Sequence, residues 1–122
     1  MSLLAVGTLA YDSIETATER RSDLLGGSAT YFSLAASRFG GVSLVGVVGT
    51  DFRASDTELL RSRGIDLAGL EVAKGKTFRW SGRYEADWNT RHTLSTNLNV
   101  FEHFDPKVPF AQRAARFVFL AN

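Results

Sequence analysis

Blocks of apolar and polar residues alternate along the first half of the chain and predict a strand, a helix, a strand and a helix in that order. Residues 3–7 form a short apolar run that ends in glycine, and the chain then turns polar as far as Asp12. This is the pattern of a buried first strand, with Asp12 just beyond its end. Residues 42–48 are rich in valine and uncharged, as expected for a strand buried on both faces of a parallel sheet.

Two helices are predicted between and after these strands. The first begins at Gly26-Gly27-Ser28 and ends at Gly40-Gly41, and its core-facing residues recur at spacings of three and four: Ala29, Phe32, Ala36 and Phe39. The second has the spacing of a capping box at Ser55 and Glu58, and ends at Gly64. This order of elements predicts right-handed βαβ units and therefore an α/β fold.

Two other segments have the pattern of exposed ribbons. Residues 13–25 are polar and charged, with enough threonine and isoleucine for a thin strand pair. Residues 77–84 alternate so that Phe78, Trp80 and Tyr84 share one face, and residues 86–89 can turn the chain back into a strand over 91–97. An amphipathic ribbon of this kind must cover a substrate cleft, the core or a second copy of the protein.

The last part of the chain predicts a short helix over residues 108–116, with Asp105-Pro106 as its start, and then a fully buried strand over 117–121. A buried parallel strand needs neighbours on both sides and a crossover that covers it. We therefore expect this sequence to be the front portion of a larger domain. The alternative is a terminal strand inserted at the centre of the sheet.

Composition and charge exclude several classes of function. The 122 residues include fourteen lysines and arginines against thirteen aspartates and glutamates, a net charge of +1. The basic residues are scattered, so no nucleic-acid partner is expected. The chain has no cysteine, which excludes a thiol nucleophile. It has only two histidines, His92 and His103, so a metal site is not expected. No apolar run is long enough to cross a membrane, and we expect a cytoplasmic protein.

Several familiar catalytic motifs do not occur. The glycines at 46 and 49 lack the spacing of a dinucleotide fingerprint, and Gly75-Lys76-Thr77 is followed by a strand pattern instead of the helix that a P-loop requires. No G-x-S-x-G nucleophile elbow is present. Both histidines are expected to face solvent or to form hydrogen bonds in loops.

Two carboxylates at predicted strand ends, Asp12 and Asp51, remain as candidates for chemistry, together with the diglycine before the first helix. Ligands of open α/β sheets collect at the carboxyl ends of the strands, where glycine lets the backbone approach closely. An ionised carboxylate such as Asp12 can accept hydrogen bonds from two neighbouring hydroxyls of a polyol. The structural alternatives are an Asx turn at Asp12 and a helix cap at Asp51.

The residues that carry a family resemblance are 26–40, with a diglycine, an alanine-rich helix and a final glycine, and 44–51, which end in G-x-x-G-x-D. Together they resemble the first signature of the PfkB (ribokinase-like) carbohydrate kinases. The resemblance covers all 122 residues. It implies a ribokinase-like parallel sheet with flanking helices and a small β lid, formed here by residues 13–25 and 77–97.

The resemblance also implies transfer of the γ-phosphoryl group of ATP to a hydroxyl of a sugar or nucleoside. By position, Asp12 matches the carboxylate that binds the sugar hydroxyls, and Gly26 and Gly27 match the diglycine that lies against the sugar. Tyr31 stands where many members carry asparagine, and Ser28 where ribokinases often have lysine. Tyr31 is therefore either a contact to a different substrate or a packing residue.

The second signature of the family, which supplies the general base and the anion hole, does not occur in these 122 residues. We therefore expect the parent protein to be a kinase that uses ATP and Mg²⁺, with this chain truncated before the nucleotide-binding half, without catalytic residues and inactive alone. A homodimer through the β lid is a further expectation. The alternative function is a non-catalytic α/β binding or dimerisation module.

Overall fold

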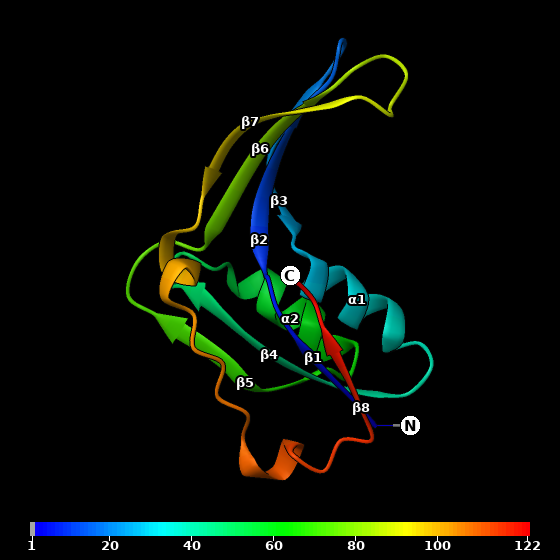
Figure 1. Ribbon diagram of the computed structural model, residues 1–122, viewed down its shortest axis with the longest axis vertical. Helices are drawn as coiled ribbons and strands as arrows, with labels where there is room; N and C mark the ends of the chain where they lie inside the picture. Colours follow the sequence, from blue (N-terminus) through cyan, green and yellow to red (C-terminus); the bar gives the residue numbers. More distant parts are fainter. Residues whose placement is uncertain (1) are drawn as a thin grey trace.

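The computed structural model describes residues 2–122, which form two four-stranded sheets (Figure 1). The first, which we call the main sheet, has the strand order β5-β4-β1-β8, and neighbouring strands are all parallel. Its strands are β1 (Ser2–Val6), β4 (Gly41–Gly49), β5 (Asp66–Ala73) and β8 (Phe117–Leu120). The expected parallel α/β architecture is therefore present, with residues 42–48 at the buried centre of the sheet.

The second sheet, which we call the lid sheet, has the order β3-β2-β6-β7. Its strands are β2 (Ala10–Glu15), β3 (Arg20–Gly26), β6 (Phe78–Tyr84) and β7 (Arg91–Asn97). Two antiparallel hairpins, β2–β3 and β6–β7, are joined edge to edge by the parallel pair β2–β6. Figure 1 shows this sheet rising from the main sheet and curving over α1. It contains both of the predicted ribbons.

Helices α1 (Ser28–Ala36) and α2 (Ala54–Ser62) cover one face of the main sheet. Ala29 of α1 and Leu60 of α2 are fully buried in one core cluster with Leu44 and Val48 of β4. Both crossovers move in the same direction along the sheet, and right-handed crossovers then place both helices on the same side. No helix among residues 2–122 is long and apolar enough to span a membrane.

The predicted ends of both helices need correction. Helix α1 ends at Ala36, so Phe39 lies beyond the helix and is 81% exposed instead of facing the core. Helix α2 begins at Ala54 with Arg53 at the N-cap position and no side-chain cap, so the capping box at Ser55 and Glu58 is not formed. The spacing was present, but the helix starts two residues too early for Ser55 to be the N-cap.

The predicted helix over residues 108–116 is wrong. The structure has only short 3₁₀ turns in this part of the chain, at Asn99–His103 and Phe110–Gln112. Asp105 and Val108 each precede a proline, which disfavours the α conformation at both positions. Strand β5, in contrast, was not predicted, because an edge strand with a mixed pattern of exposed and half-buried residues lacks a clear period.

Strand β8 forms as predicted, but it is not buried. It pairs with β1 alone among the described strands, and its four side chains are 39–79% exposed. Phe119 stacks on Phe32 of α1 with ring centroids 3.8 Å apart, whereas Val118 and Leu120 lie on the opposite face of the sheet, beside Leu4 and Val6. The alternative of a final strand at the centre of the sheet is therefore wrong, and β8 is an apolar edge strand.

Candidate functional site

A cavity of about 490 Å³ lies between the lid sheet and the first turn of α1. Residues from the lid sheet, from the start of α1, from the first 3₁₀ turn and from the segments that follow β1 and β8 line it: Thr8, Ala10, Asp12, Gly27, Ser28, Tyr31, Phe78, Trp80, Tyr84, Arg91, Phe101 and Asn122. The volume is in the range that suits a small-molecule ligand. Three of the four predicted site residues, Asp12, Gly27 and Tyr31, are among these lining residues. The fourth, Gly26, lies against the carboxylate of Asp12.

Asp12 contributes a carboxylate to the cavity wall. It is the third residue of β2, inside the lid sheet, and not just beyond the end of β1 as predicted. The side chains of Ala10 and Asp12 face the cavity, while Tyr11 between them is buried on the other face. No residue among 2–122 forms a hydrogen bond or ion pair with this carboxylate, and burial raises the pKa of Asp12 above its ordinary value of 3.8. Asp12 is thus free to accept hydrogen bonds from a ligand, and it forms no Asx turn.

The diglycine positions this carboxylate. Gly26 pairs with Ala10 across β2–β3, and a Cβ atom at Gly26 would overlap the Asp12 carboxylate. Gly27 has a φ of 98°, and a Cβ there would lie 2.8 Å from the Cα of Leu9. The first glycine therefore leaves space for Asp12, and the second lets the chain turn from the lid sheet into α1. Only Gly27 lines the cavity itself.

Three hydroxyls lie on the helix side of the cavity. Tyr31, in the first turn of α1, is 60% exposed and donates its phenolic hydrogen to the carbonyl oxygen of Leu25 at 3.2 Å. Thr8 and Ser28 form a hydrogen bond with each other at 3.0 Å, and both hydroxyls contact the Asn122 carbonyl oxygen. Tyr31 therefore faces the cavity and does not pack into the core.

Asp51 does not face the cavity and does not cap a helix. Its carboxylate accepts hydrogen bonds from the backbone N–H and the hydroxyl of Thr77, at 2.9 and 2.7 Å, and from Arg79 at 2.7 Å. Burial pushes the pKa of Asp51 upward, but the Thr77 hydrogen bonds and the Arg79 charge outweigh it and leave this pKa below 3.8. The helix cap considered for Asp51 is therefore wrong, because its partners are Thr77 and Arg79 at the start of β6.

Tyr11 and Arg53 form a second connection between α2 and the lid sheet. The Tyr11 hydroxyl donates to Asp56 at 2.7 Å and accepts from the Arg53 backbone N–H at 2.9 Å. The Arg53 guanidinium donates to the Asp23 carbonyl oxygen at 2.6 Å and lies over the Tyr11 ring, 4.3 Å from its centroid. These contacts lie on the face of β2 opposite Asp12, so they fix the base of the lid sheet without occupying the cavity.

The predicted aromatic face of the 77–84 ribbon lines the cavity. Phe78, Trp80 and Tyr84 all contribute to the wall. Sequence reasoning missed Phe101, whose ring stacks on Phe78 with centroids 5.7 Å apart, and Arg91, which lies opposite Tyr84 in the β6–β7 register. The register with Tyr84 was a usable signal for Arg91, whereas Phe101 lies in a turn whose position depends on the whole fold.

The two histidines lie outside the cavity. His92 is on β7 and contacts Glu85 at 2.9 Å, and His103 is largely exposed. The interpretation of both as exposed or hydrogen-bonded residues is correct, although His92 belongs to a strand. Among residues 2–122, no group of three or more histidine and carboxylate side chains is placed to hold a metal ion.

No protein-family model and no curated protein sequence gives a significant match to this chain. Solved structures do match. A Methanocaldococcus jannaschii nucleoside kinase, an archaeal member of the ribokinase family, matches 98% of the chain with a TM-score of 0.76 and 18% identity. A ribokinase from Cryptococcus neoformans var. grubii, in complex with ADP, matches 97% with a TM-score of 0.76 and 20% identity. A Burkholderia thailandensis nucleoside kinase, in complex with inosine, matches 80% with a TM-score of 0.70 and 18% identity.

The chain has the ribokinase fold. Its parallel sheet, flanking helices and small β lid are those expected from the resemblance of residues 26–51 to the family signature. The chain spans 44%, 41% and 35% of the lengths of these three solved chains. The part of the ribokinase fold described here therefore contains the lid sheet and the cavity beneath it.

Proposed function

We propose that this chain is the acceptor-binding and lid portion of an ATP-dependent, PfkB-type kinase that phosphorylates a hydroxyl of a sugar or nucleoside. One observation carries the proposal: a half-buried carboxylate without a protein partner, Asp12, faces a cavity roofed by a β lid. Burial of an ionisable group without a partner opposes folding, and such groups occur mainly where a ligand needs them. Acceptor hydroxyls would supply the hydrogen bonds that the carboxylate lacks.

The lid sheet would exclude water from the acceptor. Phosphoryl transfer in a closed site avoids loss of the phosphoryl group to water, and a lid that closes over the acceptor is a common solution. Phe78, Trp80 and Tyr84 provide the apolar surface for this purpose, and Asp12 lies on the same face of the same sheet. Asp12 and the diglycine would therefore hold the acceptor, with Tyr31 closing the helix side.

ATP and Mg²⁺ belong to the proposed activity of the whole protein. Transfer requires charge stabilisation around the γ-phosphate, and we assign no residue among 2–122 to the nucleotide, the metal ion or the catalytic base. The proposal therefore predicts that the isolated chain binds an acceptor but does not phosphorylate it. ATP-dependent phosphorylation of a sugar or nucleoside by the purified 122-residue chain would contradict this division of labour.

Ligand-dependent stabilisation of the chain tests the binding half of the proposal. Thermal unfolding is measured with a panel of neutral sugars and nucleosides, because a ligand that binds the folded state raises the unfolding temperature with its concentration. We expect at least one of them to stabilise the chain, and Asp12→Asn to abolish this effect. Asp105→Asn, which removes an exposed carboxylate far from the cavity, is the matched control and should leave the effect intact. Equal ligand stabilisation in the Asp12 and Asp105 variants would overturn the proposal.

The alternative function, a non-catalytic dimerisation module, was based on the aromatic face of the 77–84 ribbon. These aromatic side chains line the cavity, which favours the acceptor-binding role for this face. Pairing of two chains through other parts of the lid sheet stays a prediction. Leu94 of β7 is 51% exposed on an edge strand, and Leu94→Lys should reduce pairing of this kind in sedimentation velocity experiments.

A further inference from the structure

The acceptor proposal explains Asp12 but not the composition of the rest of the cavity wall. Five of the lining side chains are aromatic: Tyr31, Phe78, Trp80, Tyr84 and Phe101. A free pentose has no flat ring system large enough to cover several aromatic side chains. A wall that combines one carboxylate with five aromatic rings fits a ligand that has a polyol part and a flat apolar part.

Trp80 lies where such a flat part would reach it. In the parallel β2–β6 pair, Asp12 and Trp80 are direct register partners, so their side chains leave the same face of the lid sheet from adjacent strands. Adjacent strands are about 4.8 Å apart. A ligand whose hydroxyls bind Asp12 therefore has its next substituent beside the indole ring.

The indole ring of Trp80 lies against Gly82, at the place where any other residue would have its side chain. The two residues are on the same face of β6, and a Cβ atom at Gly82 would lie 2.5 Å from Cζ2 and 2.8 Å from Cζ3 of Trp80. The indole thus lies across the glycine, along the inner surface of the lid sheet. Any side chain at position 82 would push the ring away from this surface and into the cavity.

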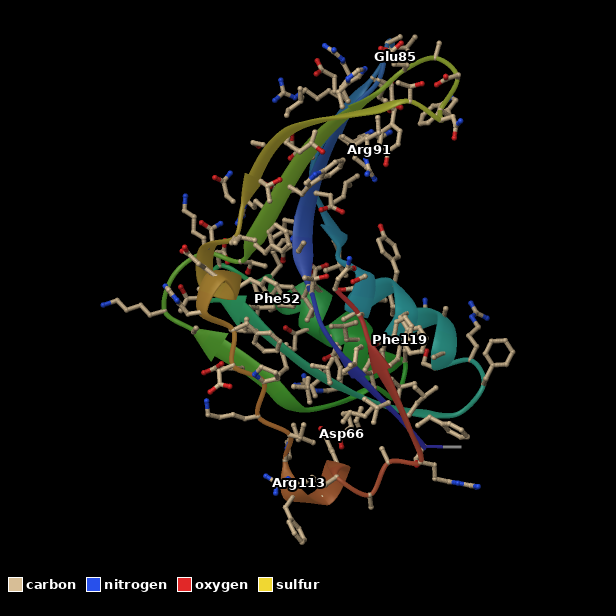
Figure 2. The ribbon with its side chains drawn as sticks, viewed as in Figure 1. Phe52, Asp66, Glu85, Arg91, Arg113 and Phe119 are labelled. Carbon is tan, nitrogen blue, oxygen red and sulfur yellow. The ribbon has the colours of Figure 1, made fainter. Side chains whose placement is uncertain are left out.

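Arg91 marks the accessible side of the same ring. Its guanidinium lies over Trp80, 5.7 Å from the ring centroid, and Figure 2 shows Arg91 beneath the lid sheet, on the side that faces α1. No carboxylate among residues 2–122 forms an ion pair with it. A guanidinium is planar and stacks on aromatic faces much as a nucleobase does. The face of the Trp80 ring that points away from Gly82 is therefore accessible to a planar group.

We infer that the acceptor is a nucleoside, with its ribose hydroxyls on Asp12 and its base stacked on Trp80. This inference rests on the proposed function and names the substrate class within it. Stacking of a base on an aromatic side chain contributes strongly to binding and tolerates different bases. The site therefore selects a nucleoside over free ribose through the lid sheet, with Gly82 as the residue that positions the indole.

Tryptophan fluorescence tests this inference directly. The chain has two tryptophans, and Trp88 lies in the exposed β6–β7 turn, so Trp88→Phe leaves Trp80 as the only reporter. Inosine, adenosine and ribose are titrated against this variant. We expect saturable quenching by a nucleoside, with an affinity at least about tenfold higher than that of ribose, whose affinity is measured by calorimetry.

Three further variants separate stacking from folding. In the Trp88→Phe background, Gly82→Ala should weaken nucleoside binding by about tenfold and leave ribose binding unchanged, while Ser81→Ala on the other face of β6 changes neither. Trp80→Leu should have the same selective effect by calorimetry, and circular dichroism confirms the fold of each variant. If ribose binds through Asp12 as tightly as either nucleoside, the inference is wrong and the proposed function stands. If neither nucleoside binds but another sugar of the panel stabilises the chain, the inference is wrong and the proposed function stands. If no sugar or nucleoside of the panel binds, both are wrong.

Discussion

Arg79, the second residue of β6, connects the lid sheet to the main sheet through Asp51, which lies two residues beyond the end of β4. The guanidinium donates to the Asp51 carboxylate at 2.7 Å and also contacts the Asp23 carboxylate of β3 at 3.3 Å. Thr77, two residues before Arg79, donates to the other oxygen of the Asp51 carboxylate from both its backbone N–H and its hydroxyl. The aspartate of the G-x-x-G-x-D motif thus fixes the position at which the lid sheet leaves the main sheet.

Loss of this connection should destabilise the chain more than loss of a surface ion pair. Arg79→Met leaves the half-buried Asp51 without its cation, and we expect a cost of about 1–2 kcal/mol in the free energy of unfolding. Arg21→Met, which breaks the exposed Arg21–Glu19 pair, is the matched control, and its effect should be close to zero. Urea unfolding measures both variants. Equal midpoints for the two variants would show that Arg79 does not anchor the lid sheet.

The Asp51 contacts should also make stability depend on pH in the acidic range. The folded pKa of Asp51 is lowered, while the unfolded value is near 3.8. A lowered folded pKa stabilises the protein fully above the unfolded pKa, and this contribution is lost as the pH falls through the folded value. The difference in unfolding free energy between the parent chain and Asp51→Asn should therefore be largest above about pH 5 and shrink on acidification. A difference that stays constant from pH 7 to acid would contradict this assignment.

The sequence predicted the parts of the fold that depend on strong local patterns. The valine-rich, uncharged run at 42–48 favours a buried parallel strand, and the alternation at 77–84 placed three aromatic residues on the correct face. The family signature at 26–51 predicted the ribokinase fold, which the structural matches confirm. These predictions needed no knowledge of how distant segments pack.

The errors come from positions whose environment is set by tertiary contacts. The polar turn of the chain after Gly7 predicts Asp12 just beyond the end of the first strand, yet Asp12 lies in β2, which has one face on the cavity and the other under Arg53 and Arg79. Gly82 shares a face of β6 with Trp80, but the close approach of the indole ring to it appears only in the folded chain. Arg91 carried no motif, and its position over Trp80 depends on the pairing of β6 with β7. A period-based prediction describes one strand at a time and cannot give such cross-strand neighbours.

Two glycine substitutions should separate the site from general stability. Gly26→Ala places a methyl group against the Asp12 carboxylate and should weaken acceptor binding by about tenfold or more, since it displaces the binding group. Gly64→Ala meets no atom within 4 Å but has a φ of 74°, so it should cost about 1 kcal/mol of stability without changing affinity. Calorimetry and urea unfolding on the same two proteins measure the contrast. If both variants lose affinity, Gly26→Ala acts through the stability of the fold and not through the binding site.

Asp12 should carry the signature of a functional residue that opposes folding. Burial raises its folded pKa, so the ionised carboxylate destabilises the free chain above that pKa, and the penalty disappears as the pH falls below the unfolded value of 3.8. Asp12→Asn should therefore raise the unfolding temperature at pH 7, raise it less in acid, and lose acceptor binding. A variant that is less stable than the parent at pH 7 would show that Asp12 serves the fold.

The exposed apolar strand β8 should make the isolated chain associate. Val118 and Leu120 are 58% and 79% exposed on one face of an edge strand that pairs only with β1 among residues 2–122, and unpaired apolar edges promote pairing with other chains. Concentration-dependent association should be visible by sedimentation velocity, and Leu120→Lys should reduce it. Phe110→Lys is the control, because Phe110 is equally exposed in a 3₁₀ turn without a strand edge. If the two lysine variants behave alike, general surface hydrophobicity and not the β8 edge drives the association.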